Sequence, residues 1–164
     1  MFTLCRIHGV IDRKMYEKLC EAVMRAKATN TFLLLHINSV GGYTKWALKM
    51  HKLLFYCKYY NIETHAAGYQ KVHSVALFVY LSCVFRVAYQ ETQFLIHRAV
   101  PVPGDTKASV TRADRITLGF LSEITDVSLP EAYELANAHT YLSYDYAKQK
   151  KIINFEWNKG SLTT

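Results

Sequence analysis

A serine, a histidine and a pair of glycines each follow an apolar segment of this sequence. Gly41 and Gly42 come after "FLLLHINSV", Ser74 comes shortly after "IETHAA", and His97 closes "QFLIH". A serine hydroxyl can attack a carbonyl carbon when a histidine removes its proton, and glycine N–H groups can bind the oxyanion that forms. These residue types therefore predict acyl-transfer chemistry, provided that the fold brings them together.

Each of these residues also has a simpler explanation. A Gly-Gly pair is often only a tight turn, and a serine at the start of a helix is often an N-cap. His97 fits equally well as a surface histidine or as one that is hydrogen-bonded in the core. Spacing alone leaves these alternatives open.

Apolar segments of strand length alternate with segments of helical periodicity along the whole chain. This alternation indicates βαβ units and a mostly parallel sheet. Because the carboxyl ends of parallel strands meet at one edge, that edge is where ligands bind in such folds. Strands are expected at residues 2–8, 32–37, 62–67, 85–90 and 93–97, and helices at about 12–28, 43–57, 74–82, 110–124, 128–139 and from 143 onward.

Length and composition are those of one globular domain, residues 1–164. The chain is 51% hydrophobic and 20% charged, which excludes a disordered protein. Its net charge of +7 is spread over the sequence, and only Lys148, Lys150 and Lys151 form a cluster. Scattered basic residues are typical of a solvated surface, so no nucleic-acid partner is expected.

The cysteines and the apolar runs bear on the cellular compartment. Cys5, Cys20, Cys57 and Cys83 lie in apolar stretches without CxxC or metal-ligand spacing. This pattern predicts reduced, buried thiols, no bound metal or cofactor, and a cytoplasmic protein. The longest apolar run, "SVALFVYLSCVF", is shorter than a bilayer-spanning helix needs, so no membrane association is expected.

The order of these segments resembles the Clp protease proteolytic subunit, the ClpP-type serine peptidases with the spiral ClpP/crotonase-like fold. The matches to the family's Asn-Ser-Pro-Gly-Gly stretch, to its nucleophile segment and to its Met-Ile-His-Gln-Pro segment fall at three strand ends, in the order that the family has them. The segments that carry the resemblance are "RIHGVID", "HINSVGGYTKWALKMHKLL", "HSVALFVYLS", "QFLIHRAV", "LSEITDVSLPEAYELA" and "YLSYDYAKQKKIIN".

The resemblance implies a serine endopeptidase that hydrolyses peptides or unfolded proteins through an acyl-enzyme. Ser74 would be the nucleophile and His97 the general base. The N–H groups of Gly42 and Val75 would hold the oxyanion, with Gly41 beside them and residues 40–44 along the substrate. The implied partners are further copies of the chain in a ring, heptameric in this family, and an unfoldase ATPase.

The third position of the triad departs from the family pattern. The resemblance places His139 where the family has an aspartate, and a neutral imidazole can orient His97 without stabilising the imidazolium as a carboxylate does. Asn137, Glu134 and Asp126 are the alternatives for this role. The departure favours a second interpretation, a catalytically weak or inactive assembly or regulatory subunit.

The segment of about residues 100–125 matches the family's helical handle in shortened form, which argues against the stacking of two rings. A crotonase-type acyl-CoA enzyme would share the fold and the oxyanion hole. The sequence shows no nucleotide-binding groove or added catalytic acid for that reaction.

Overall fold

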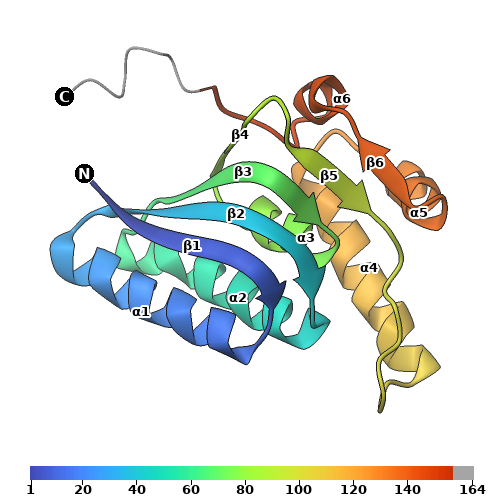
Figure 1. Cartoon of the computed structure of the whole chain (residues 1–164), viewed down its shortest axis with the longest axis horizontal. Helices are drawn as coiled ribbons and strands as arrows, with labels where there is room; N and C mark the ends of the chain where they lie inside the picture. Colours follow the sequence, from blue (N-terminus) through green and yellow to red (C-terminus); the bar gives the residue numbers. More distant parts are fainter. Residues whose placement is uncertain (157–164) are drawn as a thin grey trace.

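The computed structural model of the chain describes residues 1–156. Strands and helices alternate along the first half of the chain, and helices dominate the second half (Figure 1). The elements are β1 (Phe2–Ile11), α1 (Arg13–Thr29), β2 (Phe32–Gly42), α2 (Thr44–Cys57), a 3-10 turn (Lys58–Tyr60), β3 (Thr64–His73), α3 (Val75–Leu81), β4 (Phe85–Ala88), β5 (Gln93–Ile96), α4 (Lys107–Ile124), α5 (Leu129–Asn137), β6 (Thr140–Leu142) and α6 (Tyr144–Gln149).

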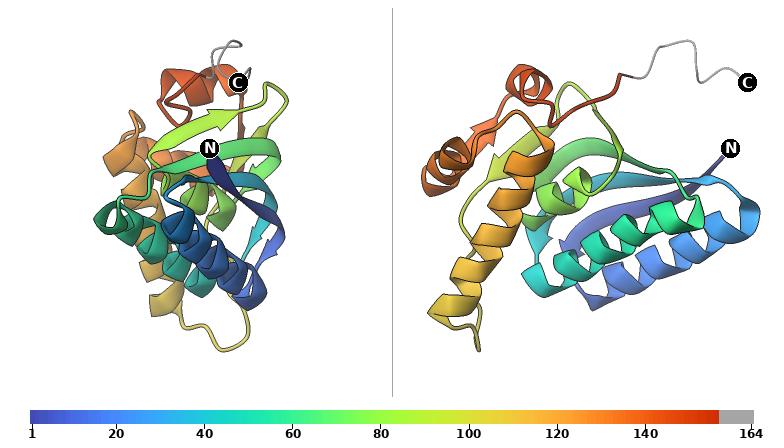
Figure 2. Two further views of the ribbon diagram at one scale, coloured as in Figure 1. Left: turned by 90° about the vertical axis from the view of Figure 1, so that its left-hand side faces the viewer. Right: turned by 180° about the vertical axis from the view of Figure 1, so that it is seen from behind.

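The strands form one sheet in the order β1-β2-β3-β5-β6, and β4 pairs with an earlier part of β3. All pairs are parallel except β5 with β6, which confirms the predicted mostly parallel α/β fold. Helices α1, α2 and α3 lie against one face of the sheet (Figure 1). The loop after β5 and the start of α4 extend away from the sheet (Figure 2).

The core lies between the sheet and these helices. In β2, Leu33, Leu35 and Ile37 are fully buried toward the helices, because side chains alternate between the two faces of a strand. Met50 and Leu54 of α2 contribute to the same cluster. The four cysteines are free thiols, as predicted, and all are buried except the half-buried Cys20.

Three strands are longer than predicted, and each correction affects the site. The predicted end of the first strand at Gly9 is wrong, because this glycine absorbs a register shift between His8 and Val10 and β1 continues. Gly41 and Gly42 belong to the end of β2 and not to a loop after it. Likewise β3 continues beyond Gly68 to His73, so residue 74 follows a strand directly.

Candidate active site

Ser74 forms a one-residue junction between β3 and α3. Its backbone has φ 57° and ψ −130°, a combination that costs a residue with a side chain about 1–3 kcal/mol. Although Ser74 occupies the N-cap position of α3, its side chain makes no capping hydrogen bond. The structure therefore gives no support to the N-cap alternative, and the sharp strand-to-helix turn is the backbone arrangement that exposes a nucleophilic serine in α/β hydrolases.

The pairing of β3 with β5 brings Ser74 close to His97. His73 is paired with Leu95 in this parallel ladder, and the Ser74 N–H donates to the Leu95 carbonyl oxygen at 2.9 Å. His97 follows the last residue of β5. Both side chains line one pocket, together with apolar residues of α3 and α4 that include Leu77, Phe78, Leu118 and Leu121.

The hydrogen bonding of His97 fixes its tautomer. Its Nδ1 lies 2.6 Å from the carbonyl oxygen of Arg98, an atom that can only accept a hydrogen bond. Nδ1 must therefore carry the proton, which leaves Nε2 of the neutral ring as a lone-pair acceptor. This is the tautomer that a general base for Ser74 requires.

The two glycines allow close approach of the backbone, Gly41 to Ser74 and Gly42 to β1. Gly41 has φ +98°, and a Cβ atom there would lie 2.9 Å from the Cβ of Ser74. A Cβ atom on Gly42 would lie 2.4 Å from the carbonyl oxygen of Ile11 in β1. The Gly41 N–H donates to the Oγ of Ser39 at 3.1 Å. Val75 is the first residue of α3, where backbone N–H groups have no acceptor within the helix.

His139 lies beside His97 but does not meet it edge to edge. The antiparallel pair of Ile96 with Thr140 brings the two histidines together, and their rings stack with centroids 5.1 Å apart and an angle of 27° between planes. A hydrogen bond between two imidazoles requires the N–H of one ring to point, within the plane of that ring, at a nitrogen of the other. Stacked rings do not meet in this way, and in the described part of the chain no hydrogen bond joins His97 to His139. The triad role predicted for His139 stays a prediction.

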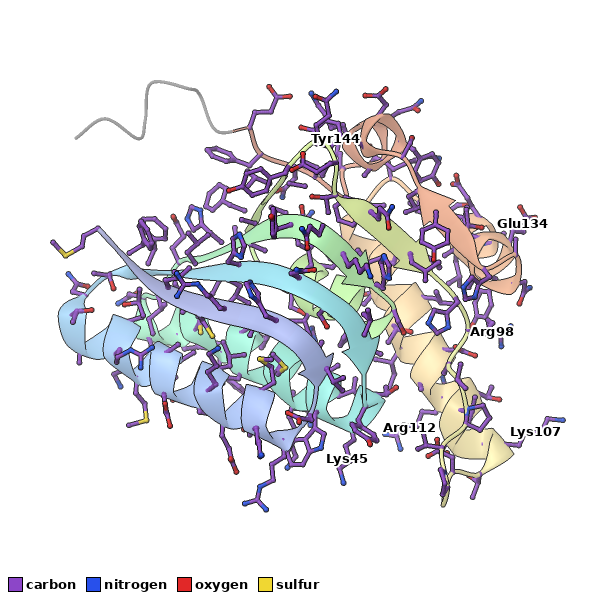
Figure 3. The ribbon with its side chains drawn as sticks, viewed as in Figure 1. Lys45, Arg98, Lys107, Arg112, Glu134 and Tyr144 are labelled. Carbon is purple, nitrogen blue, oxygen red and sulfur yellow. The ribbon has the colours of Figure 1, made fainter. Side chains whose placement is uncertain are left out.

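The other candidates for the third position are placed differently. Asn137 accepts a hydrogen bond from Nη1 of Arg98 at 2.8 Å. Glu134 is exposed on α5 (Figure 3), and Asp126 pairs with Lys151 at 2.9 Å. Only Asn137 thus contacts a residue bonded to His97.

An ion pair that sequence reasoning missed lies next to His97. Arg98 donates from Nε to Oδ2 of Asp114 at 2.7 Å, and the Ala99 N–H donates to Oδ1 at 2.7 Å. The Asp114 side chain is 3% exposed and that of Arg98 is 41% exposed. Asp114 lies among the apolar positions of α4. A single acidic residue beside a predicted buried stripe is the feature of the sequence that could have identified it.

His73 is a further histidine of this region that sequence reasoning passed over. Its ring packs edge-on against Tyr141 with centroids 5.6 Å apart, and its buried Nε2 has no hydrogen-bond partner among the described residues. Burial lowers the pKa of His73, and the charges of Lys71, His97 and His139 lower it further. His73 is therefore neutral at pH 7.

A second serine–histidine contact, His51 with Ser82, has a structural explanation. The Oγ of Ser82 donates its one proton to the Phe78 carbonyl oxygen at 2.8 Å. It must then accept a hydrogen bond from Nδ1 of His51, which lies 2.9 Å away. A histidine that donates to the hydroxyl cannot remove its proton, so this pair is not a second nucleophile and base.

Within residues 1–156, no group of three His, Cys, Asp or Glu side chains is arranged to hold a metal ion. The helices of the same part of the chain are all too short or too polar to cross a bilayer.

Comparisons with known proteins agree with this fold. The chain superposes on a mutant of ClpP1 from Listeria monocytogenes with a TM-score of 0.84 and 20% sequence identity, covering 96% of this chain and 92% of that one. For ClpP1 from Listeria monocytogenes the TM-score is 0.82 and the identity 21%, covering 96% and 94%. A search of the curated proteins gives no match. The model of the Clp protease family matches residues 4–126, most of the chain, and the chain therefore belongs to that family.

Proposed function

We propose that this chain is a serine endopeptidase that cleaves peptides or unfolded proteins, with residues 1–164 as one peptidase domain. The observation that carries the proposal is that a strained Ser74, free of a capping bond, lines the same pocket as a His97 whose Nε2 is an acceptor. Both residues line one pocket with largely apolar walls, which suits an apolar substrate side chain next to the scissile bond.

The reaction assigns one task to each group. Nε2 of His97 takes the proton of Ser74 as the Oγ attacks the peptide carbonyl, and the N–H groups of Gly42 and Val75 bind the oxyanion. The imidazolium then gives its proton to the leaving amine as the C–N bond breaks. Water, deprotonated by His97, hydrolyses the acyl-enzyme and restores Ser74.

The substrate and the assembly belong to the same proposal. An extended peptide would lie along residues 40–44, where β2 ends beside Ser74. The chain would act in the cytoplasm as a ring of identical copies, and an unfoldase ATPase would deliver unfolded substrate. The sheet face opposite α1 and α2 offers one surface for contacts between copies, because the half-buried rings of Phe32, His65 and Phe85 lie on it.

A fluorophosphonate probe tests the proposal, because it forms a stable bond only with an activated serine. The purified, assembled protein is expected to react once per chain, and peptide mapping by mass spectrometry should place the adduct on Ser74. Absence of an adduct on folded, assembled protein would contradict the proposal. It would favour the alternative, an inactive assembly or regulatory subunit whose third triad position has lost its carboxylate.

His139 occupies the third position of the triad in this proposal. Two variants measure how much it contributes to the labelling rate. His139→Asp is expected to raise the labelling rate about tenfold, because a carboxylate roughly 5 Å from the imidazolium, partly screened by water, stabilises the charge of His97. His139→Ala should lower the rate only a few-fold, since it removes a stacked ring and no hydrogen bond. Equal rates in all three proteins would show that His139 has no part in the triad.

A further inference from the structure

We infer that Asp114 is a positioning residue that acts on His97 through a single peptide group, the one between Arg98 and Ala99. The carbonyl of this peptide accepts the Nδ1–H of His97 at 2.6 Å, and its N–H donates to Oδ1 of Asp114 at 2.7 Å. A carboxylate, a peptide and the imidazole thus form one chain of hydrogen bonds. The inference rests on the proposed function, and it supplies the carboxylate that position 139 lacks.

Hydrogen bonds of the Arg98 side chain also hold this peptide in place. Arg98 donates from Nε to the second carboxylate oxygen of Asp114 at 2.7 Å and from Nη1 to Asn137 at 2.8 Å. The two oxygens of Asp114 therefore accept hydrogen bonds from Arg98 and Ala99, the two residues that follow His97. Figure 3 shows Arg98 between α4, which carries Arg112, and α5, which carries Glu134. With its side chain and the following N–H both anchored, the Arg98 carbonyl has little freedom to turn away from His97.

The electrostatics explain why a relayed carboxylate can serve the base. A negative charge that accepts from the peptide N–H polarises the amide and makes its carbonyl oxygen a stronger acceptor, because hydrogen bonds in a chain reinforce one another. The nearly complete burial of the Asp114 carboxyl strengthens this effect. When His97 takes the proton of Ser74, its positive charge then faces a carbonyl backed by a carboxylate.

The other titratable groups near His97 are two histidines and the guanidinium of Arg98. His73 lies at the end of β3 and His139 before β6, and neither offers a negative charge. The Arg98 guanidinium compensates the charge of Asp114, and its position on the solvent side lets water screen it more than the carboxylate. Asp114 is therefore the carboxylate that reaches His97 by the shortest bonded path in the described part of the chain.

The test compares Asp114→Asn with Glu17→Gln in the full-length, assembled protein. The first variant keeps an acceptor for the Ala99 N–H but loses the charge. The second removes the carboxylate of another arginine ion pair, Glu17 with Arg13 on α1, which is also 2.7 Å long. Fluorophosphonate labelling is measured from pH 5 to 9. Asp114→Asn is expected to label roughly ten- to a hundredfold more slowly at the plateau, a smaller loss than removal of a directly bonded carboxylate causes. Glu17→Gln should stay within twofold of the unchanged protein.

The pH profile separates a positioning role from a structural one. Without the carboxylate the imidazolium is less stable, so the acidic limb of the labelling profile should move to lower pH in Asp114→Asn. A variant that had only lost folded protein would keep the position of the limb. An unchanged rate and limb in Asp114→Asn, with Ser74 labelled in the unchanged protein, would overturn the inference.

A second measurement needs neither catalysis nor a stable variant. Nitrogen-15 NMR of histidine-labelled protein distinguishes the two neutral tautomers of His97. The Nδ1–H form in the unchanged protein supports the relay even if no probe reacts with Ser74, in which case only the proposed peptidase activity fails. The Nε2–H form would overturn the relay whatever the activity.

Discussion

Ser74→Ala is expected to abolish fluorophosphonate labelling, and His97→Ala to slow it by several powers of ten. The reason is that the serine hydroxyl is a weak nucleophile unless Nε2 of His97 takes its proton as the bond forms. Because the two residues act as one unit, the double variant should hydrolyse a peptide substrate no more slowly than either single variant. Peptide hydrolysis by all three variants, corrected for folded protein by circular dichroism, gives the comparison.

The chain provides a control in a serine and a histidine that lie elsewhere. His51→Ala and Ser82→Ala remove a serine–histidine hydrogen bond of 2.9 Å outside the Ser74 pocket. Both variants should therefore keep the labelling rate within a few-fold. Labelling that survives in Ser74→Ala but disappears in Ser82→Ala would refute the assignment of the nucleophile.

The layout of the fold was predictable because burial leaves a pattern in the sequence. A continuous apolar run such as residues 32–37 fits a strand covered on both faces, and the segments between such runs have helical periodicity. With the strands parallel, their carboxyl ends meet at one edge, which is why Gly41, Ser74 and His97 could be placed together. The order of strands and helices follows from the alternation of apolar and polar residues alone.

The ends of the strands were not predictable in the same way. Gly9 and Gly68 were interpreted as breaks, but backbone pairing with a neighbouring strand outweighs the poor strand propensity of one glycine. Register shifts in both ladders keep the pairing beyond the irregular residues. Such shifts depend on which strands are neighbours, and that information is not local in the sequence.

The side chains around His97 could not be predicted from the sequence. Arg98 and Asp114 are separated by a loop and the first two turns of α4, so no spacing rule connects them. The motif comparison pointed to position 139 for the third triad residue. Whether a side chain there meets the edge or the face of His97 depends on ring orientation, which residue type does not determine.

Gly41→Ala is expected to lower the labelling rate about a hundredfold or more, since a displacement of roughly 1 Å at a nucleophile costs about that much. The new Cβ would lie 2.9 Å from Cβ and 3.3 Å from Oγ of Ser74, and 3.0 Å from the His73 carbonyl oxygen. The two nearest of these atoms, Cβ of Ser74 and the His73 carbonyl oxygen, are fixed by the backbone. The Ser74 turn must therefore shift, and with it the direction of the Oγ toward the substrate carbonyl.

Backbone strain alone has to be separated from this steric effect, because Gly41 has φ +98° and alanine is strained there. Gly9 has φ +89° and Gly104 φ +93°, yet a Cβ at either position would meet no atom within 4 Å. Gly9→Ala and Gly104→Ala thus carry similar strain without a contact to Ser74. They should lose stability in a thermal melt and keep the labelling rate of the remaining folded protein. A loss of rate in all three variants would mean that strain, and not the contact of Gly41 with the serine, controls the site.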